Sequence, residues 1–87
     1  SMCARIDAWI RQAESDFRVG QLTDAQNFHS QAWYHYGHAA EKALKGWLLL
    51  LGIVPPYSYS LDRLVDELVD QGINVVPLRG LHLKGFS

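Results

Sequence analysis

The hydrophobic residues of this chain recur at helical spacing in three separate stretches. Between residues 4 and 21 they fall three or four positions apart, as they do on one face of an α-helix. These residues are Ile6, Trp9, Ile10, Ala13 and Phe17. Polar and charged side chains occupy the opposite face. We therefore predict a first helix over residues 4–21, weakened at its end by Gly20, and a short connection over residues 22–25.

A broader apolar arc marks residues 25–51, which we predict to be the longest helix. Its members are Phe28, Ala32, Tyr36, Ala39, Ala40, Ala43, Leu44, Trp47, Leu50 and Leu51. Thr23 or Asp24 carries a side-chain oxygen suited to capping its first turn. Gly52 is expected to end it in the left-handed conformation. His29 falls inside the apolar arc, where we expect it to be packed.

A third helix is predicted to begin after a proline-containing segment. The two prolines at 55 and 56 make residues 53–59 unsuitable for a helix. Ser60 is expected to cap the helix, with Asp62 in its first turn, and Gly72 to end it. Its apolar stripe is Leu61, Leu64, Val65, Leu68 and Val69. Residues 73–78 then predict an extended segment broken by Pro77, and residues 79–87 have no clear period and are expected to fray.

These elements predict an all-α fold, an up-and-down antiparallel bundle of about three helices with an extended C-terminal tail. The short connection favours antiparallel packing of the first two helices, and the third is expected to cross them. The predicted helical domain spans residues 4–72, and residues 73–87 form the extended or flexible tail.

The apolar content is high for so short a chain. It has 87 residues, 48% of them hydrophobic, and three tryptophans, which is a heavy load for one small domain. The arc of the longest helix is too broad for three helices to cover, so an interface is favoured over a cofactor pocket. We predict a homodimer. The predicted interface and core residues are Phe28, Tyr36, Ala40, Leu44, Trp47 and Leu51.

Charge and cysteine content exclude several classes of function. A net charge of −1 gives no overall attraction to nucleic acid or anionic lipid. The single cysteine, Cys3, excludes an internal disulfide framework and a four-thiolate zinc site. No signal peptide is recognisable, and the apolar run over residues 47–51 is too short to span a bilayer. We expect a cytoplasmic protein that does not enter a membrane.

A stripe of basic side chains on the longest helix is the main candidate for ligand chemistry. His35 and His38 are one turn apart, and Lys42 and Lys45 continue the stripe. Such cations suit a phosphate group, and Tyr34 supplies a flat surface for a base. The alternative is a solvated face on which Glu41 pairs with Lys45, and base rates favour this alternative. A third strong metal ligand is missing, so we expect no metal and no cofactor.

The order of these features resembles the HEPN domain, named for higher eukaryotes and prokaryotes nucleotide-binding. The resemblance covers about residues 5–70 and implies an up-and-down helical bundle that commonly dimerises. Members include ribonucleases, toxins or antitoxins paired with minimal nucleotidyltransferases, and domains proposed to bind nucleotides. The residues that carry it are Trp9, the Gln-Ala-Glu-Ser-Asp-Phe string over residues 12–17, Phe28, the Ala-Ala-Glu-Lys-Ala-Leu-Lys string over residues 39–45, Gly52, Ser60, Leu61, Leu64 and Leu68.

The chain departs from the family pattern where activity is concerned. Ribonucleases of the family carry an arginine, four to six residues and then a histidine, whereas Arg79 and His82 are too close together. Gly37 and His38 stand where many members have paired glutamines, Tyr59 replaces a usual histidine, and the chain has one or two helices fewer than most members. We expect a short or truncated member.

The predicted function is that of a non-catalytic protein. It would act by dimerisation and by binding a nucleotide, RNA or a nucleotidyltransferase partner of the toxin–antitoxin type. Two alternatives stay open. One is a metal-independent ribonuclease that uses His82 with Arg79, or His38 with lysines; the other is a degenerate protein with no retained activity.

Overall fold

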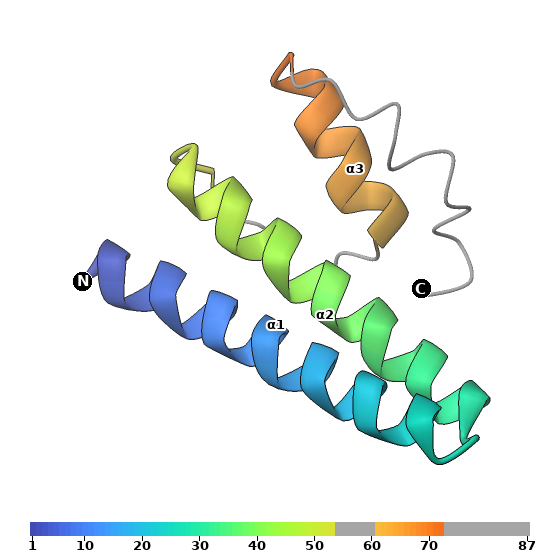
Figure 1. Cartoon of the computed structure of the whole chain (residues 1–87). Coiled ribbons are helices and arrows are strands. Elements are labelled where there is room, and N and C mark those ends of the chain that lie inside the picture. The colour runs from blue at the N-terminus through green and yellow to red at the C-terminus, as the bar shows by residue number, and fades with distance from the viewer. Residues whose placement is uncertain (54–60, 73–87) are drawn as a thin grey trace.

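The computed structural model describes residues 1–53 and 61–72, with only the backbone of Leu61. Helix α1 spans Met2–Ala25, α2 spans His29–Leu50 and α3 spans Leu61–Asp70, and no strand occurs within these ranges. Figure 1 shows α1 and α2 side by side in opposite directions, with α3 against α2 on the side away from α1. The predicted all-α helical bundle is confirmed.

The turn between α1 and α2 differs from the prediction, because residues 22–25 are helical and the connection is residues 26–28. Asn27 takes the left-handed conformation, with φ of 67°, which asparagine tolerates better than most residues. The Thr23 hydroxyl donates back to the carbonyls of Val19 and Gly20, at 2.8 and 3.1 Å. Thr23 therefore stabilises the C-terminal end of α1. The predicted cap of α2 by Thr23 or Asp24 was wrong, since Phe28 takes the N-cap position with no side-chain hydrogen bond.

The contact between α1 and α2 is formed by one row of side chains from each helix, spaced alternately by three and four positions. Small residues in both rows let the helices approach closely. Gly20 lies against the Tyr36 ring, and Gly46 lies against Trp9 and Ile10. The α1 row is Ile6, Trp9, Ala13, Asp16, Gly20 and Thr23, and the α2 row is Ala32, His35, Ala39, Lys42, Gly46 and Leu49, all of them buried or half-buried.

The apolar core lies between α2 and α3. It contains Leu44, Leu48, Leu64, Val65 and Leu68, with Ala40 and Ile53 packed against it. The predicted α3 stripe is confirmed for its three central members, Leu64, Val65 and Leu68. It was wrong for Val69, which is 42% exposed because it lies toward the solvent side of α3.

Both predicted glycine stops are confirmed. Gly52 and Gly72 have φ of 82° and 81°, in the left-handed region where a residue without Cβ is favoured. Asp62 lies in the first turn of α3, as expected. The predictions for residues 54–60, including the Ser60 cap, and for residues 73–87 fall outside the described residues.

Candidate functional site

An open apolar groove of about 530 Å³ runs along the α1–α2 pair. Its floor is built from alanines, and the Phe17 and Tyr36 rings pack beside it with their centroids 5.4 Å apart. Glu14 is the one charged side chain among the lining residues, which are Ile10, Ala13, Glu14, Phe17, Tyr36, Ala39, Ala40 and Ala43. The groove is thus a hydrophobic hollow open to solvent.

The structure places the predicted interface residues in different surroundings. Tyr36 and Ala40 line the groove, Trp47 is exposed on α2 and Leu51 is exposed directly after α2. Leu44 is buried against α3, and Phe28 is exposed at the α1–α2 turn. Further large apolar side chains are exposed on α1 and α2, among them Ile10, Phe17, Trp33 and Leu50. The role of these residues in a dimer stays a prediction.

A charged cluster joins α1 to α2 on another face. The Lys42 ammonium donates a hydrogen bond to the Asp16 carboxylate, and the Nδ1 atom of His35 lies 3.3 Å from the other carboxylate oxygen. All three side chains are less than one-third exposed. Burial raises the pKa of Asp16, but the hydrogen bonds and positive charges of Lys42 and His35 outweigh it, so the pKa is lowered overall. Asp16 is therefore ionised at neutral pH.

The lysine one turn further on is also paired. The Lys45 ammonium lies 3.0 Å from a Glu41 carboxylate oxygen and 5.1 Å from the centre of the Trp9 ring. The predicted Glu41–Lys45 pair is confirmed. The expectation that this face is solvated was wrong, because Lys45 is only 7% exposed and His35 and Lys42 point to Asp16.

The structure thus brings the four predicted phosphate ligands onto one side of α2 but gives three of them internal partners. His35 and Lys42 contact Asp16, and Lys45 contacts Glu41. His38 instead lies with its ring centre 4.4 Å from that of the exposed Tyr34. Because carboxylates offset the lysine charges, this face attracts an anion less than the sequence suggested, and phosphate binding there stays a prediction.

Asp16 is the central residue of this cluster, and reasoning from the sequence missed it as a site residue. The signal was the spacing, since Asp16 continues the row of Ile6, Trp9 and Ala13 and precedes Gly20 in it. A carboxylate at an apolar-row position predicts a cationic partner on the facing helix.

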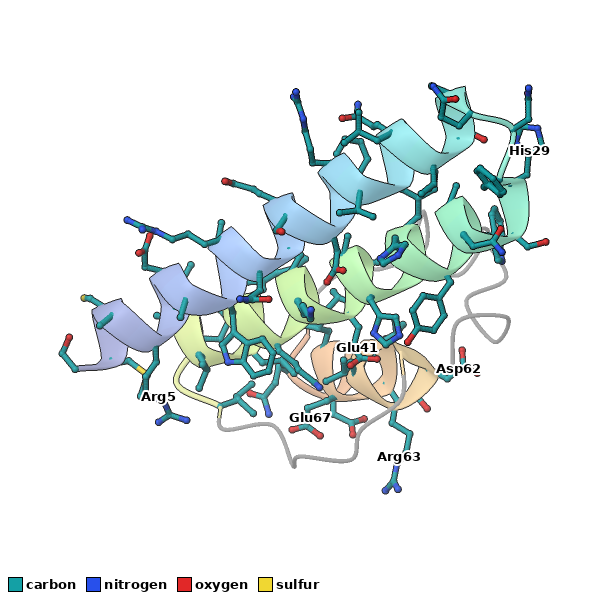
Figure 2. All side chains as sticks on the ribbon, turned by 90° about the horizontal axis from the view of Figure 1, so that it is seen from below. Arg5, His29, Glu41, Asp62, Arg63 and Glu67 are labelled. Carbon is teal, nitrogen blue, oxygen red and sulfur yellow. The ribbon has the colours of Figure 1, made fainter. Side chains whose placement is uncertain are left out.

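His29 does not pack in the apolar arc as expected. It begins α2 at the end of the hairpin where the turn joins the two helices (Figure 2), and its Nδ1 atom lies 2.6 Å from an Asp24 carboxylate oxygen. The apolar arc of α2 does not extend back to His29, because the facing helix α1 ends at Ala25. This pair is a surface contact at the turn.

Two negative findings apply to the described residues alone. In residues 1–53 and 61–72, no three His, Cys, Asp or Glu side chains lie close enough to hold a metal ion. Of the three described helices, none has the length and apolar content needed to cross a membrane. Arg79 and His82, the nearest sequence match to the ribonuclease motif, lie outside the described part.

A helical hairpin with a third helix on one side and an open apolar groove defines a small all-α helical bundle. The HEPN domain model matches residues 6–81. The chain belongs to the HEPN domain family, as the resemblance predicted. Neither the comparison with curated proteins nor that with solved structures returned a match.

Proposed function

We propose that this chain acts by association rather than catalysis, and that it forms a homodimer through the groove. The observation that supports this is the apolar groove itself, open to solvent and floored by alanines. Contiguous apolar surface of this kind on a small soluble domain marks an interaction site. Its aromatic border fits the composition of interface cores, which are enriched in such residues.

The exposed apolar side chains supply a large part of the area that an interface needs. Ile10, Phe17, Trp47, Leu50 and Leu51 are each between 37% and 69% exposed. Together they expose on the order of several hundred Å², and a stable interface buries about 800 Å² on each partner. The groove and its border therefore supply much of a dimer contact.

Light scattering coupled to size-exclusion chromatography at micromolar concentration tests this proposal. We expect the wild type to elute with twice the mass of the chain. Ala43→Glu, which places a carboxylate at an exposed position of the groove wall, should elute as a monomer with unchanged helical circular dichroism. Leu22→Glu is the matched control, because Leu22 is exposed on α1 outside the groove.

Two results would contradict the proposal. One is a well-folded wild-type monomer at these concentrations. The other is a dimer that survives Ala43→Glu as well as it survives Leu22→Glu.

The candidate partners of the dimer are a nucleotide, RNA or a nucleotidyltransferase, in a toxin–antitoxin type of system. Family membership supports this range. One contact favours a nucleotide in particular: Tyr34 is 62% exposed and holds its ring against His38, which offers a flat surface beside an imidazole ring.

Titration of a nucleoside monophosphate and of inorganic phosphate, followed by the histidine NMR signals, tests the nucleotide proposal. We expect saturable shifts of His38 that the nucleotide produces more strongly than phosphate, and their loss in Tyr34→Ala. His29 is the internal control, since it lies at the turn next to Asp24. Equal shifts of His29 and His38 would count against a site.

The ribonuclease alternative is tested separately by incubation with RNA. Cleavage by the wild type that disappears in His38→Ala or His82→Ala would overturn the non-catalytic proposal.

A further inference from the structure

Helix α2 carries a third row of residues between the rows that contact α1 and α3. It shares Tyr36 with the α1 contact and Ala40 with the border of the α2–α3 core. We name it the outer row: Tyr36, Ala40, Ala43, Trp47 and Leu50, spaced by four, three, four and three positions. This alternation is the heptad spacing of helices that pack along a seam. Ala43, Trp47 and Leu50 are exposed, and Tyr36 and Ala40 are half-buried at the groove. A seam with this spacing fits another helix.

The sizes in the outer row are arranged around its centre. Two alanines, Ala40 and Ala43, lie in the middle, and large side chains lie on both sides of them. Packed helices cross at an angle, so they are closest at one point and diverge on both sides. Alanines at the crossing point permit a close approach, and Tyr36 and Trp47 are large enough to fill the space where the helices diverge. The row is therefore complementary to a second copy of itself.

The row on α1 that borders the groove shows the same arrangement. Ile10 and Phe17 are exposed on either side of Ala13 and Glu14. Since Ile10 lies near Gly46 and Phe17 near Tyr36, the Ala13–Glu14 position is level with the middle of the outer row. A single two-fold axis can therefore pass through the centres of both rows.

We infer that two copies pack with their α2 helices antiparallel, on a two-fold axis between Ala40 and Ala43. The inference rests on the proposed homodimer and names its geometry. Ala40 then faces the partner's Ala43, Tyr36 faces the partner's Trp47, and Ile10 comes opposite the partner's Phe17. The two hairpins form a four-helix arrangement in which both walls of the groove are covered.

A parallel dimer on the same row accounts for less of the surface. A two-fold axis along α2 would set the two α1 helices on opposite sides of the α2 pair. Ile10 and Phe17 would then stay exposed, although they line the same groove as the outer row. The antiparallel arrangement buries both sets of apolar side chains with one contact, which the hydrophobic effect favours.

The distance between two spin labels, measured by double electron–electron resonance, tests the geometry. The label is placed on Gln31→Cys in a Cys3→Ser background, since both residues are exposed. With the axis between residues 40 and 43, the two labelled positions are separated along the helix by about 21 residues. At about 1.5 Å per residue this is about 30 Å, whereas a parallel pair places the labels at the same height.

A pair of aromatic substitutions tests the residues of the row. Trp47→Ala should raise the Kd of the dimer at least tenfold, because tryptophan is enriched among the buried interface residues that contribute most to binding. Tyr34→Ala is the matched control, an exposed aromatic residue of α2 outside the outer row. Circular dichroism confirms that both variants keep their helices.

The outcomes separate the geometry from the proposed function. A dimer with a label distance above about 30 Å, since the spacing between the two helices adds to the separation along them, and a selective Trp47→Ala effect is the expected result. A dimer with a short label distance, or one equally sensitive to both substitutions, overturns the antiparallel geometry and leaves the homodimer intact. A monomer overturns both.

Discussion

Asp16 is the residue that most changes how the polar side of α2 is understood. Its carboxylate is held between His35 and Lys42 at the α1–α2 contact, so these two basic side chains fix the helix pair. A partly buried carboxylate that has lost water needs such partners to stay ionised. The basic stripe is therefore largely a structural feature, and His38 is its member that packs against the Tyr34 ring instead of a carboxylate.

Asp16→Asn should destabilise the chain at neutral pH by about 1–3 kcal/mol, because the partly buried Lys42 loses its charged partner. The pKa of Asp16 is lower in the folded chain than in the unfolded chain. Its contribution is therefore present above the unfolded value of about 3.9 and is lost as the pH falls through the folded pKa. Melting curves between neutral pH and strongly acidic pH, at one protein concentration, measure this contribution.

The matched control for Asp16 is Asp7→Asn on the same helix. Asp7 pairs with Arg11 at the surface, and the loss of such a pair costs at most about 1 kcal/mol. The melting temperature of Asp16→Asn should fall less than that of the wild type when the pH drops below about 4. Parallel pH curves for the wild type and Asp16→Asn would show that the carboxylate is not stabilised by folding.

At the scale of the elements, the sequence was sufficient for what depends on local pattern. The three helices, the apolar stripe of α3 and the glycine stops at Gly52 and Gly72 were predicted, because helical periodicity and backbone conformation are local properties. The residue pairs between helices were not. A helical wheel shows which residues share a face but not which neighbour covers it, so Lys45 was expected in solvent although Trp9 lies over it.

The candidate sites followed the same division. The sequence predicted an apolar arc too broad for three helices, since arc width is visible in the sequence. It did not predict the groove, because half of the lining residues come from α1. The position of the turn was predicted wrongly for a related reason. The Thr23 hydroxyl donates to carbonyls of its own helix, and the sequence alone does not show whether a threonine will do this or cap the next helix.

Gly20→Ala tests how tightly α1 packs on α2. Helix propensity alone would stabilise the variant by about 1 kcal/mol. However, the new Cβ would lie 2.6 and 2.7 Å from two atoms of the rigid Tyr36 ring, so we expect a net loss of about 1–3 kcal/mol in the free energy of unfolding. Denaturant unfolding at fixed protein concentration measures it.

Two comparisons make the Gly20→Ala result specific. Gly46→Ala should cost less, since its nearest new contact is the flexible end of Ile10 at 3.1 Å. In a Tyr36→Ala background, Gly20→Ala should become neutral or stabilising. A loss that persists without the ring would show that the cost arises elsewhere than at this contact.

At the scale of the whole molecule, the proposed homodimer predicts that stability depends on association, because the α2–α3 core is small and the groove is exposed. If two copies bury the groove, the melting temperature rises with protein concentration, because binding of the folded state shifts the unfolding equilibrium. We expect this rise for the wild type and for Leu22→Glu, and its absence in Ala43→Glu. Differential scanning calorimetry over a hundredfold range of concentration measures it, and a constant wild-type melting temperature would contradict the dimer.

The charge of Glu14 in the groove gives a second test of the proposed dimer geometry. It is the one charged side chain lining the groove and lies level with the proposed two-fold axis. An antiparallel pair therefore brings Glu14 close to the partner's Glu14, and like charges at an interface oppose binding. Glu14→Gln should lower the Kd of the dimer several-fold at low salt, and added salt should reduce the difference between variant and wild type.

Sedimentation equilibrium at two salt concentrations measures this effect, with Asp7→Asn as the control. Asp7 lies on the same helix, nearer its N-terminus, and does not line the groove. A parallel dimer would separate the two Glu14 side chains to opposite sides of the α2 pair, where neutralising them changes little. A tighter dimer for Glu14→Gln, with no change for Asp7→Asn, would therefore place the axis beside Glu14 from charge alone, independently of the spin-label distance.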